Sequence, residues 1–228
     1  SEQVHSELRA YSDAPALFSP HPLFENFGER VERSEACVRL GLDPANRYVL
    51  FFGLIRDYKG LDLLLDAWGM LKREGKLEGH KLIVAGEYYS GKERYAEQID
   101  ALGIRGDLVL MDRYISDGDV AKFFSAADLV VQPYRHATQS GVTQIAYQFC
   151  VPMVVTKVGG LAEIVPDGRV GYVCEPTPEG VAGAIERMYE GDTLQRFREN
   201  CVEERRRFSW EEMCSRITEL YGLVASGK

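Results

Sequence analysis

The feature that most constrains the fold is a regular alternation of short apolar runs with amphipathic segments, which begins near residue 47. The apolar runs are rich in Val, Leu and Ile, as strands buried on both faces are. They predict strands at Tyr48–Gly53, Lys81–Gly86, Leu108–Met111, Leu129–Gln132, Met153–Thr156 and Gly171–Cys174. The intervening segments carry apolar residues at helical spacing, which predicts helices at 61–71, 94–102, 117–127 and 141–149. This order predicts an α/β fold with a doubly wound parallel sheet, in which ligands bind beyond the carboxyl ends of the strands.

The two ends of the chain differ from the alternating region. Residues 1–38 combine a helical segment with an extended Pro-rich connection, and the chain opens with Ser1 in place of an initiator methionine. We therefore expect residues 1–38 to be an inter-domain linker and the end of a missing amino-terminal domain. Residues 39–207 would form one ligand-binding domain and residues 208–228 a carboxyl-terminal helix. Ser209 is the expected N-cap of that helix, with Glu212 completing a capping box.

Composition and charge exclude several classes of protein. The net charge of the 228 residues is -8 and no basic face dominates, which argues against a nucleic-acid binder. Five cysteines are odd in number and lack metal-ligand spacing, so we expect reduced thiols and no metal site. We find no run of 18 apolar residues and no signal peptide. These features predict a cytoplasmic protein, and peripheral contact with the inner membrane face stays open for the full-length protein.

A first candidate site lies at the turn after the first predicted strand. Gly53 ends the strand, Arg56 and Lys59 stand on the turn, and Gly60 opens the next helix. An Arg fork and a compact Lys charge are the groups that neutralise phosphate oxygens, so we expect both cations to act on a diphosphate. The competing interpretation is two solvated loop cations.

A second candidate site follows the strand at 129–132. A polar loop leads into a helix near Gly141, and such a helix start aims unpaired backbone N–H groups beyond the strand end. Ser140, Gly141 and Val142 would supply these amides, while the side chains of Thr138, Gln139 and Ser140 would add donors. The alternative is an ordinary capped helix. Two such sites in one parallel sheet fit the two phosphates of a nucleotide diphosphate, so we expect a nucleotide-sugar site.

Other loops are expected at the same edge of the sheet. Glu87 ends the second predicted strand, and Tyr114 with Ile115 follows the third, where backbone amides and an apolar wall suit a base. Glu163, after a Gly-Gly turn, is placed equally well against a sugar or ribose hydroxyl or as an acid in the first turn of a helix. His21 and His136 have no nucleophile or metal partner in the pattern, so we expect surface histidines.

Six motifs, taken in order, carry a resemblance to a known family. They are Phe52-Gly53 with Lys59–Leu64, Leu82–Gly86, Ala126–Pro133, Val151–Thr156, Val158–Val165, and Asp167-Gly168 with Gly171-Tyr172. This ordered set resembles the carboxyl-terminal half of the group 1 (family 4) glycosyltransferases over about residues 38–224. The resemblance implies one half of the GT-B fold, in which two Rossmann-like domains face each other across a cleft. It also implies that this half binds the sugar nucleotide and that the amino-terminal half binds most of the acceptor.

The resemblance implies a reaction as well. Members transfer a sugar from a nucleotide-diphosphate sugar with retention of anomeric configuration, typically without a metal, so the donor is a substrate and no cofactor is expected. Arg56 and Lys59 would then stabilise the leaving diphosphate. The acceptor, a sugar or a lipid-linked glycan, would be bound through the missing amino-terminal domain. The isolated domain is expected to be inactive.

This sequence departs from the family pattern at two places. The family's Glu-x7-Glu pair would fall near Ala137 and Ile145, where the nearest polar side chains are Gln139 and Gln144. The family's Arg directly after the first-strand glycine is replaced by Leu54, whereas Lys59 matches. These departures leave the donor sugar open. Two alternatives also remain: a GT-B sugar-nucleotide epimerase, and a non-catalytic module that binds nucleotide sugars.

Overall fold

A computed structural model describes residues 2–226 and contains one six-stranded, wholly parallel sheet. The strands are β1 (Arg47–Phe52), β2 (His80–Ala85), β3 (Leu108–Met111), β4 (Leu129–Gln132), β5 (Met153–Thr156) and β6 (Gly171–Cys174). All six coincide with the predicted strands to within one residue. The strand order is β3-β2-β1-β4-β5-β6, so β1 and β4 are neighbours at the centre. The prediction of a doubly wound parallel sheet is confirmed.

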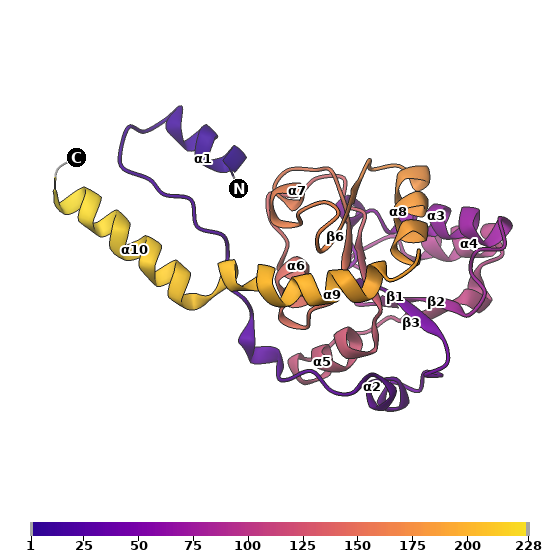
Figure 1. Ribbon diagram of the computed structural model, residues 1–228. Coiled ribbons are helices and arrows are strands. Elements are labelled where there is room, and N and C mark those ends of the chain that lie inside the picture. The colour runs from indigo at the N-terminus through magenta and orange to yellow at the C-terminus, as the bar shows by residue number, and fades with distance from the viewer. Residues whose placement is uncertain (1, 227–228) are drawn as a thin grey trace.

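Helices cover both faces of this sheet (Figure 1). They are α1 (Glu2–Arg9), α2 (Arg33–Arg39), α3 (Leu61–Arg73), α4 (Lys92–Leu102), α5 (Asp117–Ala126), α6 (Gly141–Gln148), α7 (Leu161–Ile164), α8 (Pro178–Met188), α9 (Thr193–Glu204) and α10 (Trp210–Ala225). One core joins α2, α5, α6 and α7 to the sheet, and the other joins α3, α4 and α8. Helix α9 contributes to both, because Phe197 lies in the second core and Cys201 in the first.

The central strand β1 shows how the sequence builds these two layers. Tyr48 and Leu50 point into the first core, while Val49 and Phe51 point into the second. All four are at most 1% exposed. Successive side chains of a strand alternate between faces, so a strand covered on both sides must be apolar throughout.

The segment before β1 is tied closely to the domain. Helix α2 was not predicted, because its seven residues are mostly polar and show no clear apolar stripe. Its Ala36 and Cys37 are nevertheless fully buried in the first core. The Val31 amide donates to Ser125 Oγ (3.1 Å), and the Leu23 amide donates to the Phe208 carbonyl (3.0 Å). Helix α2 therefore spans the predicted boundary at residue 38.

The last helix, α10, projects away from the sheet on the same side as α1 and the chain that follows it (Figure 1). Ser209 caps α10 as expected, since its Oγ accepts from the Glu212 amide (3.1 Å). The Glu212 carboxylate pairs with Arg216 instead of returning to Ser209, so half of the expected capping box forms.

The cysteines are all free thiols, as predicted. Throughout residues 2–226, no helix combines the length and the apolar character that crossing a membrane requires.

Candidate nucleotide-sugar site

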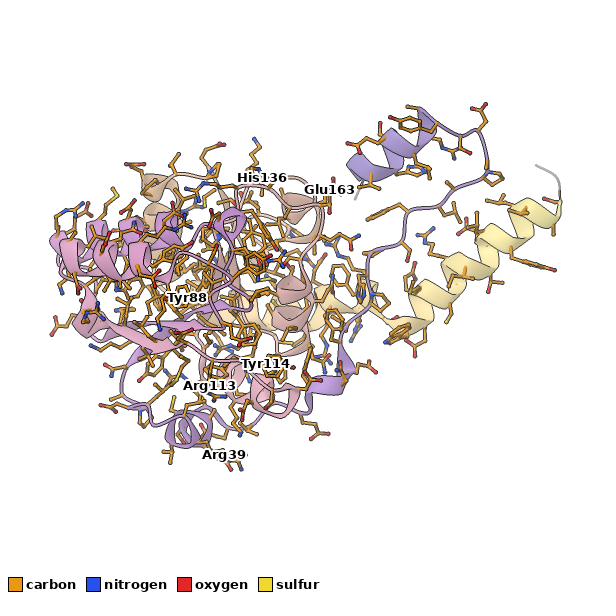
Figure 2. The ribbon with its side chains drawn as sticks, turned by 180° about the vertical axis from the view of Figure 1, so that it is seen from behind. Arg39, Tyr88, Arg113, Tyr114, His136 and Glu163 are labelled. Carbon is orange, nitrogen blue, oxygen red and sulfur yellow. The ribbon has the colours of Figure 1, made fainter. Side chains whose placement is uncertain are left out.

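The predicted site residues belong to loops that follow the strands, and parallel pairing brings these loops to one edge of the sheet. Figure 2 labels residues from four of these segments: Tyr88 after β2, Tyr114 after β3, His136 after β4 and Glu163 after β5. Connections from β1 and β4 lead to opposite sides of the sheet. The crevice between those two strands is where doubly wound folds bind their ligands.

Lys59 stands at this crevice. The side chain is 8% exposed, and its Nζ lies 2.9 Å from the point that a Cβ on Gly53 would occupy. Val142 Cγ2, at the start of α6, lies 3.8 Å from that same point. The lysine tip and the α6 start therefore meet beside Gly53, as the two-phosphate hypothesis requires.

The charge on Lys59 is poorly compensated. Burial, followed by repulsion from Arg56, lowers the pKa of its ammonium group to about 8. The centroid of the Tyr134 ring lies 5.8 Å from Nζ. Among residues 2–226, no carboxylate forms an ion pair with Lys59. A buried cation in this state is stabilised by an anion that binds from outside.

Arg56 shares the turn with Lys59 but occupies a more open position. Its side chain is exposed, and its guanidinium carbon lies 4.5 Å from the centroid of the Tyr89 ring. Stacking of this kind orients a guanidinium group while leaving its N–H donors available.

The turn that carries Lys59 is pressed against the loop after β4. Gly60 has φ +67°, and a Cβ there would stand 2.0 Å from the Pro133 carbonyl oxygen. The Arg135 amide donates to the Tyr58 carbonyl (2.7 Å), and its guanidinium group donates two hydrogen bonds of 2.7 Å to Asp62. Glycine at position 60 thus allows the turn to approach the loop after β4 closely, and the hydrogen bonds of Arg135 hold the two segments together.

A first hollow of about 140 Å³ lies on the β2 and β3 side of the crevice. Four predicted site residues line it: Gly53, Glu87, Tyr114 and Ile115. Phe52, Leu54 and Gly86 complete the lining. The Ile55 amide donates to the Glu87 carbonyl (2.8 Å), and this bond joins the loops after β1 and β2. The lining is largely apolar, which suits a flat ring better than a charged group.

A second hollow of about 90 Å³ lies at the start of α6. It gathers four more of the predicted residues: Gln139, Ser140, Gly141 and Gln144. His21, Phe24 and Ile164 complete the wall, with a ring carbon of Phe24 3.4 Å from the point where a Cβ on Gly141 would stand. His21 is exposed, as expected, but its place in this wall was missed. Contact across more than a hundred residues leaves no local signal in the sequence.

Side chains around the second hollow have distinct roles. The Ser140 hydroxyl turns inward and donates to Gln132 Oε1 (2.6 Å), so its backbone amide is the group left at the helix start. Thr138 is exposed. Gln144 is 2% exposed, and its Oε1 is buried without a hydrogen-bond partner. Ile145, by contrast, belongs to the first core. Gln144 is therefore the polar residue of α6 that a ligand in this hollow would meet.

Two other predicted features lie outside both hollows. His136 is exposed, as expected (Figure 2). Glu163 lines a separate depression of about 220 Å³ together with Phe18 and Arg207. Within residues 2–226, no three His, Cys, Asp or Glu side chains come together as metal ligands.

Comparisons with known proteins identify the family of this chain. The sequence profile of the family described as "Glycosyl transferases group 1" matches residues 46–191. A D-inositol 3-phosphate glycosyltransferase of a Nocardioides species is 31% identical over 203 residues, which make up 83% of this chain and 44% of the relative. The chain thus spans about half the length of the curated relatives that it matches.

Solved structures show the same fold. A sucrose-phosphate synthase from Thermosynechococcus elongatus superposes with a TM-score of 0.82 at 21% identity, over 100% of this chain and 58% of the other. Anabaena HepE in complex with UDP and glucose superposes with a TM-score of 0.70 at 21% identity, over 88% of this chain and 55% of HepE. At these identities the likeness establishes the fold.

Proposed function

The chain belongs to the group 1 glycosyltransferases, and from that premise we propose that it is the donor-binding half of a retaining glycosyltransferase. The observation that carries the proposal is the Lys59 ammonium group, which is buried at the crevice between β1 and β4 without a carboxylate partner. A diphosphate supplies the missing negative charge. Arg56 and the amides at the start of α6 face the same ligand.

The two hollows suggest how a nucleotide sugar lies along this edge. The base occupies the apolar hollow beside Gly53, Tyr114 and Ile115, and the diphosphate crosses Lys59 toward α6. The sugar then reaches the hollow that contains Gln139 and Gln144. We take UDP as the probe nucleotide because HepE, which shares the fold, is described in complex with UDP and with UDP-glucose.

The chemistry of this half is stabilisation of a leaving group. As the bond between the anomeric carbon and the β-phosphate oxygen breaks, its electron pair passes to that oxygen. The developing charge meets Lys59, Arg56 and the amides of Ser140, Gly141 and Val142. The acceptor oxygen forms the new bond on the same face of the sugar, and any group that handles its proton lies on the acceptor-binding half. No metal enters this scheme, so UDP binding is expected to be unchanged by EDTA.

Calorimetry with UDP tests the proposal directly. Wild type, Lys59→Met and Lys76→Met are compared, since Lys76 makes surface ion pairs with Glu74 and Glu186 and lies far from the crevice. We expect Lys59→Met to weaken UDP binding at least tenfold, on the order of one charge-assisted contact, and Lys76→Met to leave it unchanged. Equal affinity in all three proteins would refute the role of Lys59.

The acceptor is the less constrained part of the proposal. The inositol phosphate acceptor named for the curated relatives is one candidate, and a lipid-linked glycan is another. Radiolabelled transfer by a protein that includes the acceptor-binding half distinguishes them. Epimerisation of the donor without any acceptor would instead support the epimerase alternative, and complete absence of nucleotide binding would support a module with another role.

A further inference from the structure

A polar cavity that contains an unpartnered arginine lies at the opposite edge of the sheet, where the strands begin. Arg47 opens β1 and Asp128 directly precedes β4. These two residues, with Tyr189 after α8 and Arg198 on α9, line a polar cavity of about 300 Å³. The cavity is separated from the candidate nucleotide-sugar site by the length of the strands, roughly 20 Å for six residues.

Arg198 is the central residue of this cavity. Its Nε and one terminal nitrogen are buried and have no hydrogen-bond partner. Burial, followed by repulsion from Arg30, lowers the pKa of its guanidinium group below the ordinary value. An arginine stays charged in proteins, so these nitrogens carry a positive charge that the protein itself leaves unsatisfied.

The carboxylate whose charge acts on Arg198 is that of Asp128, and it already has partners. Asp128 accepts from Arg33 (3.0 Å) and from the Tyr48 amide (2.8 Å), and it lies 3.6 Å from Arg47. Asp192, at the cavity rim, is largely exposed and pairs with Arg196 (3.3 Å). Arg198 therefore gains little compensation from either acid.

Another donor in the same cavity lacks a partner. The Tyr189 hydroxyl is buried and makes no hydrogen bond. Tyr189 and Arg198 thus line one cavity and each carries a hydrogen-bond donor without a partner, and phosphate oxygens accept from donors of both kinds.

We propose that the cavity between Arg47, Tyr189 and Arg198 binds a phosphate-like dianion, either free phosphate or the phosphate group of a small monoester. The ligand would accept hydrogen bonds from Arg198 and Tyr189 and balance the excess of arginines around Asp128. This site is independent of the nucleotide-sugar site and would load whether or not UDP is bound.

Phosphate also neutralises Lys59, so the test removes that lysine first. Inorganic phosphate is titrated by calorimetry into Lys59→Met protein at constant ionic strength set with chloride. We expect saturable binding that Arg198→Met, added to the same background, weakens at least tenfold, as loss of a charge-assisted bidentate contact does. Arg216→Met is the control, because Arg216 pairs with Glu212 and Glu219 on α10, outside the cavity, and this variant should bind phosphate normally.

Three further measurements complete the test. Thermal unfolding without phosphate should show Arg198→Met at least as stable as its parent, because the substitution removes a desolvated charge. Tyr189→Phe, which deletes one hydroxyl, should weaken phosphate binding several-fold. Glycerol 3-phosphate in place of phosphate identifies the source: tighter binding indicates a monoester, weaker binding free phosphate. The proposal is overturned if Lys59→Met protein shows no saturable phosphate binding, or if Arg198→Met and Tyr189→Phe bind phosphate as their parent does.

Discussion

Arg135 and Asp62 face each other through two parallel hydrogen bonds of 2.7 Å, and this pair joins the loop after β4 to the first turn of α3. Both side chains are more than a third exposed, so the pair adds little to overall stability. Its effect is positional. It holds the turn that carries Lys59 against the loop that leads into α6.

Replacing Asp62 by Asn should therefore weaken UDP binding more than it weakens the fold. We expect a loss of about three- to tenfold in affinity and less than about 1 kcal/mol in the free energy of unfolding. Calorimetry and urea unfolding measure the two quantities. Asp107→Asn, which breaks an ion pair with Lys72 elsewhere, serves as the control. A stability loss without any change in affinity would contradict a positional role.

The affinity for UDP should depend on pH above neutrality. Lys59 has a pKa of about 8 in the free protein, and a bound diphosphate favours its charged form. Below pH 8 the ammonium group is already present, so affinity is flat. As the pH rises from 8 to 9.5, binding must take up a proton, and affinity falls by up to about tenfold per unit. Titrations between pH 7 and 9.5 check this, and Lys59→Met should show no such decline.

Lys59 should also destabilise the protein when no ligand is bound. Its folded-state pKa lies below the value of about 10.4 for an unfolded lysine, so the unfolded chain binds more protons between those two values. Wild-type stability should accordingly rise with pH through this window. At pH 7 we expect Lys59→Met to raise the free energy of unfolding by about 1–3 kcal/mol. Urea unfolding measures the change, with Lys76→Met as the matched variant; a destabilised Lys59→Met protein would count against the unpaired charge.

A side chain at Gly53 should weaken UDP binding, for a reason specific to the site. Gly53 has φ +95°, and an added Cβ would lie 2.9 Å from Lys59 Nζ. We expect Gly53→Ala to displace the ammonium group and lower UDP affinity about tenfold, with a stability loss of about 1–2 kcal/mol from backbone strain. Gly75 has φ +72° and open space around the position that an added Cβ would take, with nothing within 4 Å, so Gly75→Ala controls for strain alone. Equal UDP affinities in the two variants would show that space beside Lys59 is unimportant.

Gln144 should contribute to binding of the sugar more than of the nucleotide. Gln144 lines the hollow assigned to the sugar, and its Oε1 is buried without a hydrogen-bond partner. Gln144→Ala is expected to weaken UDP-glucose binding by about five- to tenfold and to change UDP binding less than twofold. Gln148→Ala, one turn further along α6, is the control. Equal losses for both ligands would place Gln144 against the ribose or the diphosphate.

The strands could be predicted from the sequence because burial on both faces leaves a continuous apolar run, as in β1 and β4. The meeting of Lys59 with the α6 start was also foreseeable, since parallel strands place their following loops at one edge. Helix α2 escaped prediction because its position depends on Ala36 and Cys37 packing into a distant core. The part of the second hollow that His21 and Phe24 form was not predicted for a similar reason. His21 and Phe24 reach it through the docking of a Pro-rich segment, which no local pattern records.

The solitary ammonium group beside Gly53 has a consequence for turnover. A site that is stabilised by any bound diphosphate does not distinguish sharply between the nucleotide-sugar donor and the nucleotide diphosphate product, because both carry the same pyrophosphate group. We therefore expect the nucleotide product to linger and to compete with incoming donor. In an enzyme that contains this domain, release of the nucleotide product would then limit the turnover rate more than cleavage of the glycosidic bond does.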